Sequence, residues 1–222
     1  MLKTLLHGRA AAYALAGVLP VTALLATAAL APSGLGIVSA AHAQTSGSTA
    51  SDTAFVRALG AKLTAVVNGS GSVAEKKTQI LPLLSNDVDV DSIGRFCLGR
   101  FWNTASPAQQ QRYLTLFHQV LTNTITGKLG DYKGVGIAVG QANSQDGKTY
   151  VPTTITRPGQ PPAAVQWVVS DASGAPKVVD VVAEGVSLSL TQRSDYASYL
   201  AHNGNNVDAL LNALTRQVSR AS

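Results

Sequence analysis

The sequence predicts an α+β fold in which helices pack on one face of an antiparallel sheet. Two observations support this prediction. Apolar residues recur at helical spacing in the first and last parts of the chain, and the middle part consists of short apolar runs separated by turn residues. The order of elements, helices then strands then helices, is typical of α+β domains.

Helical periodicity marks six segments, and the clearest of them begins at Ser106. This serine can cap the helix, Pro107 suits the first helical position, and Gln109 completes a capping box. The helix carries an apolar stripe that is predicted to face the core and includes Leu116, Phe117, Val120 and Leu121. The six predicted helices are 52–67, 73–84, 90–98, 106–130, 192–200 and 207–218.

Four strands are predicted between residues 134 and 190, joined by Asn-, Gly- and Pro-rich turns. They cover 134–140, 149–156, 163–169 and 176–190, and short connections make them an antiparallel meander. Strand alternation groups apolar side chains on shared faces, namely Val151 with Ile155, Val165 with Trp167 and Val169, and Val179 with Val181. Together with the stripe of the 106–130 helix, they either pack as a solid core or line a cavity, and the pattern alone favours the core.

The N-terminus has the pattern of a secretory signal peptide. Lys3 and Arg9 are followed by a long apolar stretch, and Ala41-His42-Ala43 forms an A-x-A cleavage site. The apolar stretch is long enough to suggest an uncleaved membrane anchor instead, but Pro20 and the cleavage site favour removal. We therefore expect residues 1–43 to be cleaved, 44–51 to be a disordered mature N-terminus, and 52–222 to form a single domain.

Composition excludes some functions. The chain carries a net charge of +5, two of these charges lie in the predicted signal peptide, and no run of Lys and Arg supports nucleic-acid binding. Cys97 is the only cysteine, so no intrachain disulfide forms, and its apolar neighbours indicate a buried small hydrophobe. The sequence contains no phosphate-binding loop, dinucleotide fingerprint, nucleophile elbow or metal-ligand spacing, so no cofactor is predicted.

The 176–190 segment is a β-branched apolar run that is interrupted by Asp180 and Glu184. On a regular strand the two carboxylates share one face, which is suitable for acid–base chemistry. The alternative that we favour is structural: the acids accept hydrogen bonds from backbone N–H groups, or pair with Arg157 or Arg193. His118 and His202 have no acid at i±4, and structural or solvated roles are favoured for both.

Several stretches resemble the MlaC/Ttg2D family of periplasmic lipid-binding proteins that serve ABC transport systems. The resemblance covers about residues 52–219, and its most specific element is the Asp-x-x-x-Glu-Gly-Val-Ser run. The matching stretches are LGRFWNTASPAQQQ (98–111), VPTTI (151–155), GQPP (159–162), VQW (165–167) and VDVVAEGVS (179–187).

This resemblance implies a helical shell on a twisted, cystatin-like sheet, which together enclose an apolar lipid cavity. It implies a non-enzymatic carrier in the periplasm that moves glycerophospholipids between the outer and inner membranes and maintains lipid asymmetry. The implied partners are an inner-membrane ABC transporter with a periplasmic substrate-binding subunit and an outer-membrane lipid-extracting complex. The apolar residues predicted to contact lipid are Leu116, Phe117, Val120, Leu121, Val151, Ile155, Val165, Trp167, Val169, Val179 and Val181.

Three alternatives stay open. A branch of the same family is associated with hopanoids, so the cargo of a carrier can be a polycyclic lipid. A small enzyme can use a similar pocket with Asp180 or Glu184 as its base. A structural interaction domain has a solid core and purifies without lipid.

Overall fold

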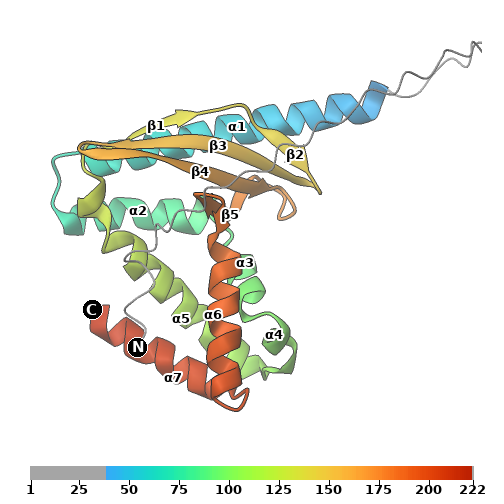
Figure 1. Cartoon of the computed structure of the whole chain (residues 1–222), viewed down its shortest axis with the longest axis vertical. Coiled ribbons are helices and arrows are strands. Elements are labelled where there is room, and N and C mark those ends of the chain that lie inside the picture. Colours follow the sequence, from blue (N-terminus) through green and yellow to red (C-terminus); the bar gives the residue numbers. More distant parts are fainter. Residues whose placement is uncertain (1–38, 222) are drawn as a thin grey trace, which may run out of the picture. The chain divides into compact units, whose positions relative to one another are not determined.

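Helices, strands and helices follow one another along the chain as predicted (Figure 1). The computed structural model describes residues 39–221. The first helices are α1 (Ser39–Asn68), α2 (Val73–Asp87), α3 (Val90–Leu98), α4 (Arg100–Thr104), α5 (Pro107–Thr126) and the 3₁₀ turn η1 (Leu129–Tyr132). The strands are β1 (Gly136–Val139), β2 (Asn143–Gln145), β3 (Lys148–Arg157), β4 (Gln160–Ser170), β5 (Lys177–Ala183) and β6 (Val186–Ser187), and they precede α6 (Leu188–His202) and α7 (Val207–Ala221).

The sheet is an antiparallel meander, which confirms the predicted topology. Its strand order is β1-β3-β4-β5-β6, and the short β2 also pairs with β3. Cross-strand register places Val151 opposite Trp167 and Trp167 opposite Val181, so these three side chains form one row on one face. Strand β2 lies in a segment that was predicted as a turn.

Helix α1 covers the apolar face of the sheet. Val56 packs against Val151 and Val169, and all three side chains are at most 1% exposed. Figure 1 shows α1 running along β3 on the far side of the sheet. Burial of a valine of this kind contributes about 2 kcal/mol, so this contact is a main source of cohesion between helix and sheet.

A β-bulge changes the register at the start of β5. Val168 pairs with Asp180, whereas Val169 pairs with Val178, so Val179 is the extra residue and has no partner in the ladder. The simple alternation from which a shared face for Val179 and Val181 was predicted is therefore interrupted at Val179. Val178, which is 2% exposed, takes the place opposite Val169, and its carbonyl accepts a hydrogen bond from the Asp89 amide.

The helices α3 to α7 form a bundle with its own core. Leu200 and Leu211 are fully buried there, and Tyr113 packs its ring against Phe117 and Tyr196. The hydroxyl of Tyr113 donates to the Gly94 carbonyl at 2.9 Å, which satisfies a buried polar group. A separate cluster joins α1, α2, η1 and the loop before β1 around Val67, Ile80, Leu129 and Val135.

Helix ends follow the chemistry of capping. The Ser106–Gln109 capping box with Pro107 in the first turn confirms the prediction for α5, and a second box at Ser72 and Glu75 starts α2.

Helix α1 begins earlier than predicted. It includes 44–51, which the sequence indicates as disordered, and the Thr53 hydroxyl bonds the Thr49 carbonyl within this turn. Asp52, which follows this turn of α1, is only 1% exposed, so this part of the helix packs against the rest of the fold.

The predicted signal peptide lies almost wholly outside the described residues, and the proposed cleavage site at 41–43 falls in the first turn of α1. Among the helices of residues 39–221, none combines the length and the apolar character needed to cross a membrane.

Candidate functional site

A pocket of about 460 Å³ lies between α2, α3 and α5. This volume is within the range of small-molecule sites. Its wall is mostly apolar, with Leu81, Leu84, Val90 and Leu121, and its polar groups are hydroxyls and one imidazole. The lining residues are Thr78, Leu81, Pro82, Leu84, Ser85, Val90, His118, Leu121 and Thr122.

The pocket is at the boundary between two hydrophobic clusters. Val90 belongs to the core of the bundle and Leu121 packs against that core, whereas Leu84 packs against the cluster between α1 and α2. Two packed units that meet at such a boundary can move apart with less loss of contact than a single continuous core. The location therefore suits a site that admits an apolar ligand.

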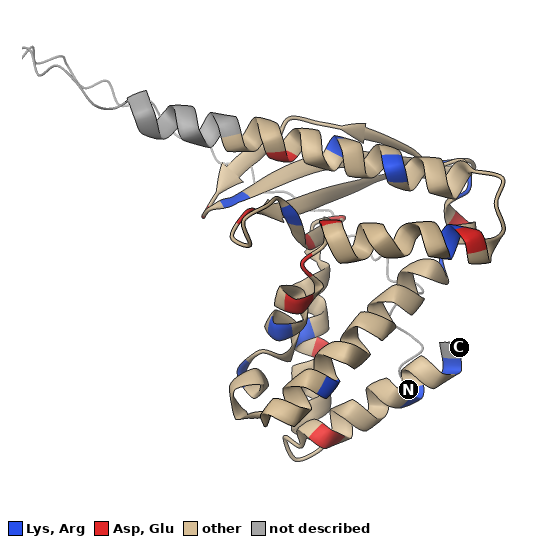
Figure 2. Ribbon diagram, turned by 180° about the vertical axis from the view of Figure 1, so that it is seen from behind, with Lys and Arg blue, Asp and Glu red and all other residues tan. Residues whose placement is uncertain are grey.

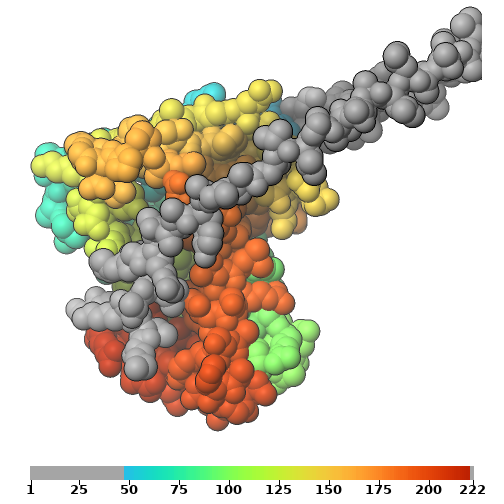
Figure 3. Space-filling model, viewed as in Figure 1, coloured from blue at the N-terminus to red at the C-terminus, as the bar shows by residue number. Residues whose placement is uncertain are grey.

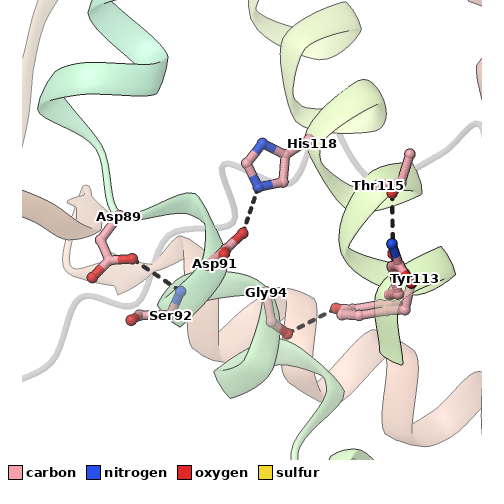
Figure 4. Close-up of polar contacts among 8 residues, drawn as sticks. Asp89, Asp91, Ser92, Gly94, Tyr113, Thr115 and His118 are labelled. Atoms are coloured by element: carbon pink, nitrogen blue, oxygen red, sulfur yellow. Dashed lines mark hydrogen bonds and ion pairs between the residues drawn. The ribbon is translucent and has the colours of Figure 1, made fainter. Parts of the chain in front are cut away.

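His118 and Asp91 form a contact at the edge of this pocket (Figure 4). The His118 Nε2 atom lies 2.7 Å from the Asp91 carboxylate, and both side chains are about half exposed. The two residues are 27 positions apart, so helical spacing at i±4 does not reveal this pair. The contact joins α3 to α5, next to the buried Tyr113–Gly94 hydrogen bond, and holds one wall of the pocket.

The predicted lipid-contacting residues of α5 lie on the bundle side. Leu116 and Phe117 are buried in the bundle core, and Val120 and Leu121 are partly buried against it. Of these, Leu121 lines the pocket. The pocket residues of α2 are apolar in the sequence, but nothing local in the chain indicates that this helix meets α3 and α5 around a pocket.

The predicted residues of the sheet fall into three environments. Val151 and Val169 are fully buried beneath α1, with Trp167 packed against them, and Ile155 packs on the cluster between α1 and α2. Trp167 donates its indole N–H to the Thr153 hydroxyl at 3.1 Å. Three valines are partly buried and belong to none of the three clusters, namely Val165, Val179 and Val181.

Asp180 is the centre of a hydrogen-bond network that joins β5 to the start of α6. Its carboxylate accepts hydrogen bonds from the Ser187 hydroxyl at 2.6 Å and from the Ser189 amide at 3.1 Å. Ser187 in turn caps α6 by accepting from the Leu190 amide. The structural interpretation of Asp180, in which its carboxylate accepts hydrogen bonds from backbone N–H groups, is therefore confirmed.

Glu184 lies beyond the end of β5 rather than on the strand. It takes a φ of 49° in the turn before Gly185, whose φ is 79°, and its carboxylate accepts from the Ala164 amide at 2.7 Å. The idea that Asp180 and Glu184 share one strand face is thus wrong. The suggested arginine partners have other contacts, because Arg193 lies over the Phe96 ring and Arg157 lies over Tyr132.

The other titratable candidates have structural surroundings. Cys97 is 1% exposed, and burial raises the pKa of its thiol to about 12, so it stays a protonated thiol at neutral pH. His202 contacts the Ser198 carbonyl within its own helix.

A second, polar hollow of about 1240 Å³ lies where α1, the β1–β2 connection and the β4–β5 loop meet. Arg57, Asp146 and Asp171 line it. Beside it, one oxygen of the buried Asp52 carboxylate has no hydrogen-bond partner, and burial raises the pKa of Asp52. Its charged lining does not suit an acyl chain.

Comparison with known proteins gives three concordant matches. The family model described as MlaC protein matches residues 58–216. The toluene tolerance protein ttg2D of Pseudomonas putida is 27% identical over 141 residues, which span 63% of this chain and 66% of that protein. A phospholipid-binding protein from Ralstonia solanacearum, solved in complex with a phospholipid, superposes with a TM-score of 0.68 at 22% identity, covering 77% of this chain and 98% of that one.

Proposed function

Because the chain belongs to the MlaC family, we propose that it is a periplasmic carrier that holds the acyl chains of a phospholipid in an apolar cavity that begins at the pocket between α2, α3 and α5. The observation that carries this proposal is the apolar pocket at the boundary of two hydrophobic clusters. The phospholipid bound to the Ralstonia protein, which has the same fold, supports the choice of ligand.

Affinity comes from removing acyl chains from water, at about 0.8 kcal/mol for each buried CH₂ group. In the sheet, Val165, Val179 and Val181 are partly buried and belong to none of the three hydrophobic clusters, which supports their proposed contact with lipid. A phosphate headgroup stays at the solvent edge, because the pocket wall offers it no buried cation. Eleven residues are proposed to contact lipid, as the sequence predicts, and Leu81, Leu84 and Val90 are added to them.

The carrier exchanges its cargo with membrane complexes. We propose an inner-membrane ABC transporter with a periplasmic substrate-binding subunit and an outer-membrane lipid-extracting complex as its partners. Release requires the cavity to open at a docking site, which the boundary between the clusters allows. The partners and their energy source set the direction of transport.

No covalent chemistry is part of this proposal. Asp180 supports the first turn of α6, Glu184 closes a turn, and the Cys97 thiol is buried with a raised pKa. These groups are used structurally, which disfavours the alternative of a pocket enzyme.

The proposal is tested with charged substitutions in the pocket. Leu121→Arg places a charge on the apolar wall, and Leu81→Arg does so at its edge, where the wild-type side chain is 39% exposed and folding is not at risk. We expect both variants to retain about tenfold less lipid than the wild type, measured by extraction and mass spectrometry.

The matched control is Val73→Arg, at an exposed position at the start of the same helix α2. It should keep wild-type loading. Full loading of both pocket variants, with unchanged circular dichroism, would contradict a lipid site in this pocket.

A further inference from the structure

Exposed apolar side chains and arginines gather where α3, α4 and α6 meet. Phe96 is 39% exposed and lies under the guanidinium of Arg193, and Leu190 is 57% exposed. Leu190 and Arg193 are three positions apart on α6, so their side chains are neighbours on its surface. We call Arg95, Phe96, Arg100, Leu190 and Arg193 the α3–α6 surface.

The arginines of this surface are held in place by aromatic rings. The guanidinium of Arg193 lies 4.8 Å from the centroid of Phe96, that of Arg95 lies 5.3 Å from Trp102, and that of Arg100 lies 4.9 Å from Phe101. Arg193 also donates to the Phe96 carbonyl at 3.3 Å. Stacking uses the flat face of a guanidinium and leaves N–H donors at its edge available.

Gly99 allows Arg193 to come this close. A Cβ atom at Gly99 would lie 3.2 Å from the guanidinium carbon, and the φ of 60° at Gly99 favours glycine. In the described part of the chain, the ion pairs involve Lys62, His118 and Lys128, so none of the three arginines is neutralised by a carboxylate at close range. Asp91 on α3 is in contact with His118, and Asp195 on α6 is partly buried.

The two helices present these groups on a shared face. Figure 3 shows the atoms of α6 bordering directly on those of α3 and α4, and in Figure 2 the basic segments of α3 and α4 lie near one another. Val186 at 55% and Leu188 at 52% exposure continue the apolar character along the chain before Leu190. Exposed hydrophobic side chains that adjoin arginines, as Phe96 and Leu190 do, are typical of an interaction surface.

We propose that the α3–α6 surface docks on an anionic phospholipid membrane. Phosphate groups fit the free edges of the three guanidinium groups, and Phe96 and Leu190 fit the boundary between headgroups and acyl chains. A surface of acidic groups alone would match the charges but would leave Phe96 and Leu190 without an apolar partner. This surface is separate from the lipid pocket, so the inference does not rest on the proposed cargo.

Vesicle binding tests the inference with the full chain, expressed so that export and processing occur in the cell. Vesicles of phosphatidylcholine with and without phosphatidylglycerol are used as the probe, and bound protein is measured by flotation. We expect binding to the anionic vesicles, reduced by salt, and a loss of about fivefold for each arginine replaced, or about a hundredfold for the Arg95→Gln, Arg100→Gln, Arg193→Gln triple variant.

A second triple variant provides the control. Lys77→Gln, Lys148→Gln and Arg216→Gln remove the same charge from exposed positions elsewhere, and this protein should bind vesicles within about twofold of the wild type. Leu190→Ser should weaken binding without changing net charge. The proposal would be overturned if the two triple variants bound vesicles equally well. It would also be overturned if the wild type did not bind vesicles, and that result would point instead to an acidic protein partner.

Discussion

Asp180 gives the sharpest test of whether its carboxylate is structural. The Asp180→Ala substitution removes the acceptor for the Ser187 hydroxyl at 2.6 Å and for the Ser189 amide at 3.1 Å, and Ser189 is only 8% exposed. Hydrogen bonds to a charged group contribute about 1.5–3 kcal/mol each, and partial exposure of Asp180 favours the lower value. We therefore expect the free energy of unfolding to fall by about 3 kcal/mol.

Asp180→Asn separates hydrogen bonding from chemistry. The amide oxygen still accepts from Ser189, so the loss should be about 1 kcal/mol, and bound lipid per protein should equal that of the wild type. The assays are urea unfolding followed by circular dichroism, and lipid extraction. The control is Asp146→Asn, in an exposed turn with a φ of 51° that asparagine also adopts, and it should stay within about 0.5 kcal/mol.

Two results would refute this reasoning. An Asp180→Ala protein as stable as the wild type would show that the network does not anchor α6. A stable Asp180→Asn protein that binds no lipid would show that the Asp180 carboxylate contributes to ligand binding and not only to the structure.

Three further predictions concern the core, the pH dependence and the thiol. Val151→Ala should cost about 2 kcal/mol of stability, whereas Val181→Arg should abolish lipid loading and leave the fold intact, as measured by urea unfolding and lipid extraction. Burial raises the pKa of Asp52 above its usual 3.8, so the folded state holds this proton more tightly and the protein loses stability as the pH rises through the pKa of Asp52. Asp52→Asn should therefore be more stable than the wild type at neutral pH, and this gain should shrink on acidification. A difference that stays constant with pH would contradict a raised pKa at Asp52. Cys97, with a pKa raised to about 12, should react with a disulfide reagent only after unfolding, and rapid reaction of the native protein would show that the site opens.

Much of the fold follows from the sequence because local signals agree with one another. The capping box at Ser106 and the turn residues between strands are short-range features, and they fixed α5 and the meander correctly. The order of elements then left few ways to pack helices on the sheet. Capping boxes and turns depend only on residues that are close to one another in the sequence.

The bulge in β5 shows where local reasoning fails. Nothing in the run of valines reveals that Val178, and not Val179, pairs with Val169, or that the Val178 carbonyl bonds the amide of Asp89, which is far away in the sequence. The His118–Asp91 contact and the pocket between α2 and α5 likewise depend on how three helices meet. The alternation of apolar residues along the strands predicted which side chains share a face of the sheet. It could not predict which of them are fully buried and which are only partly buried.

Native mass spectrometry of the protein, expressed as the full chain and purified without detergent, tests the central claim most directly. The account predicts one bound lipid per chain, and denaturing analysis should identify it as a phospholipid, while the mass of a hopanoid would change the cargo and keep the carrier. A folded protein that purifies without lipid and also refuses added phospholipid would contradict the account.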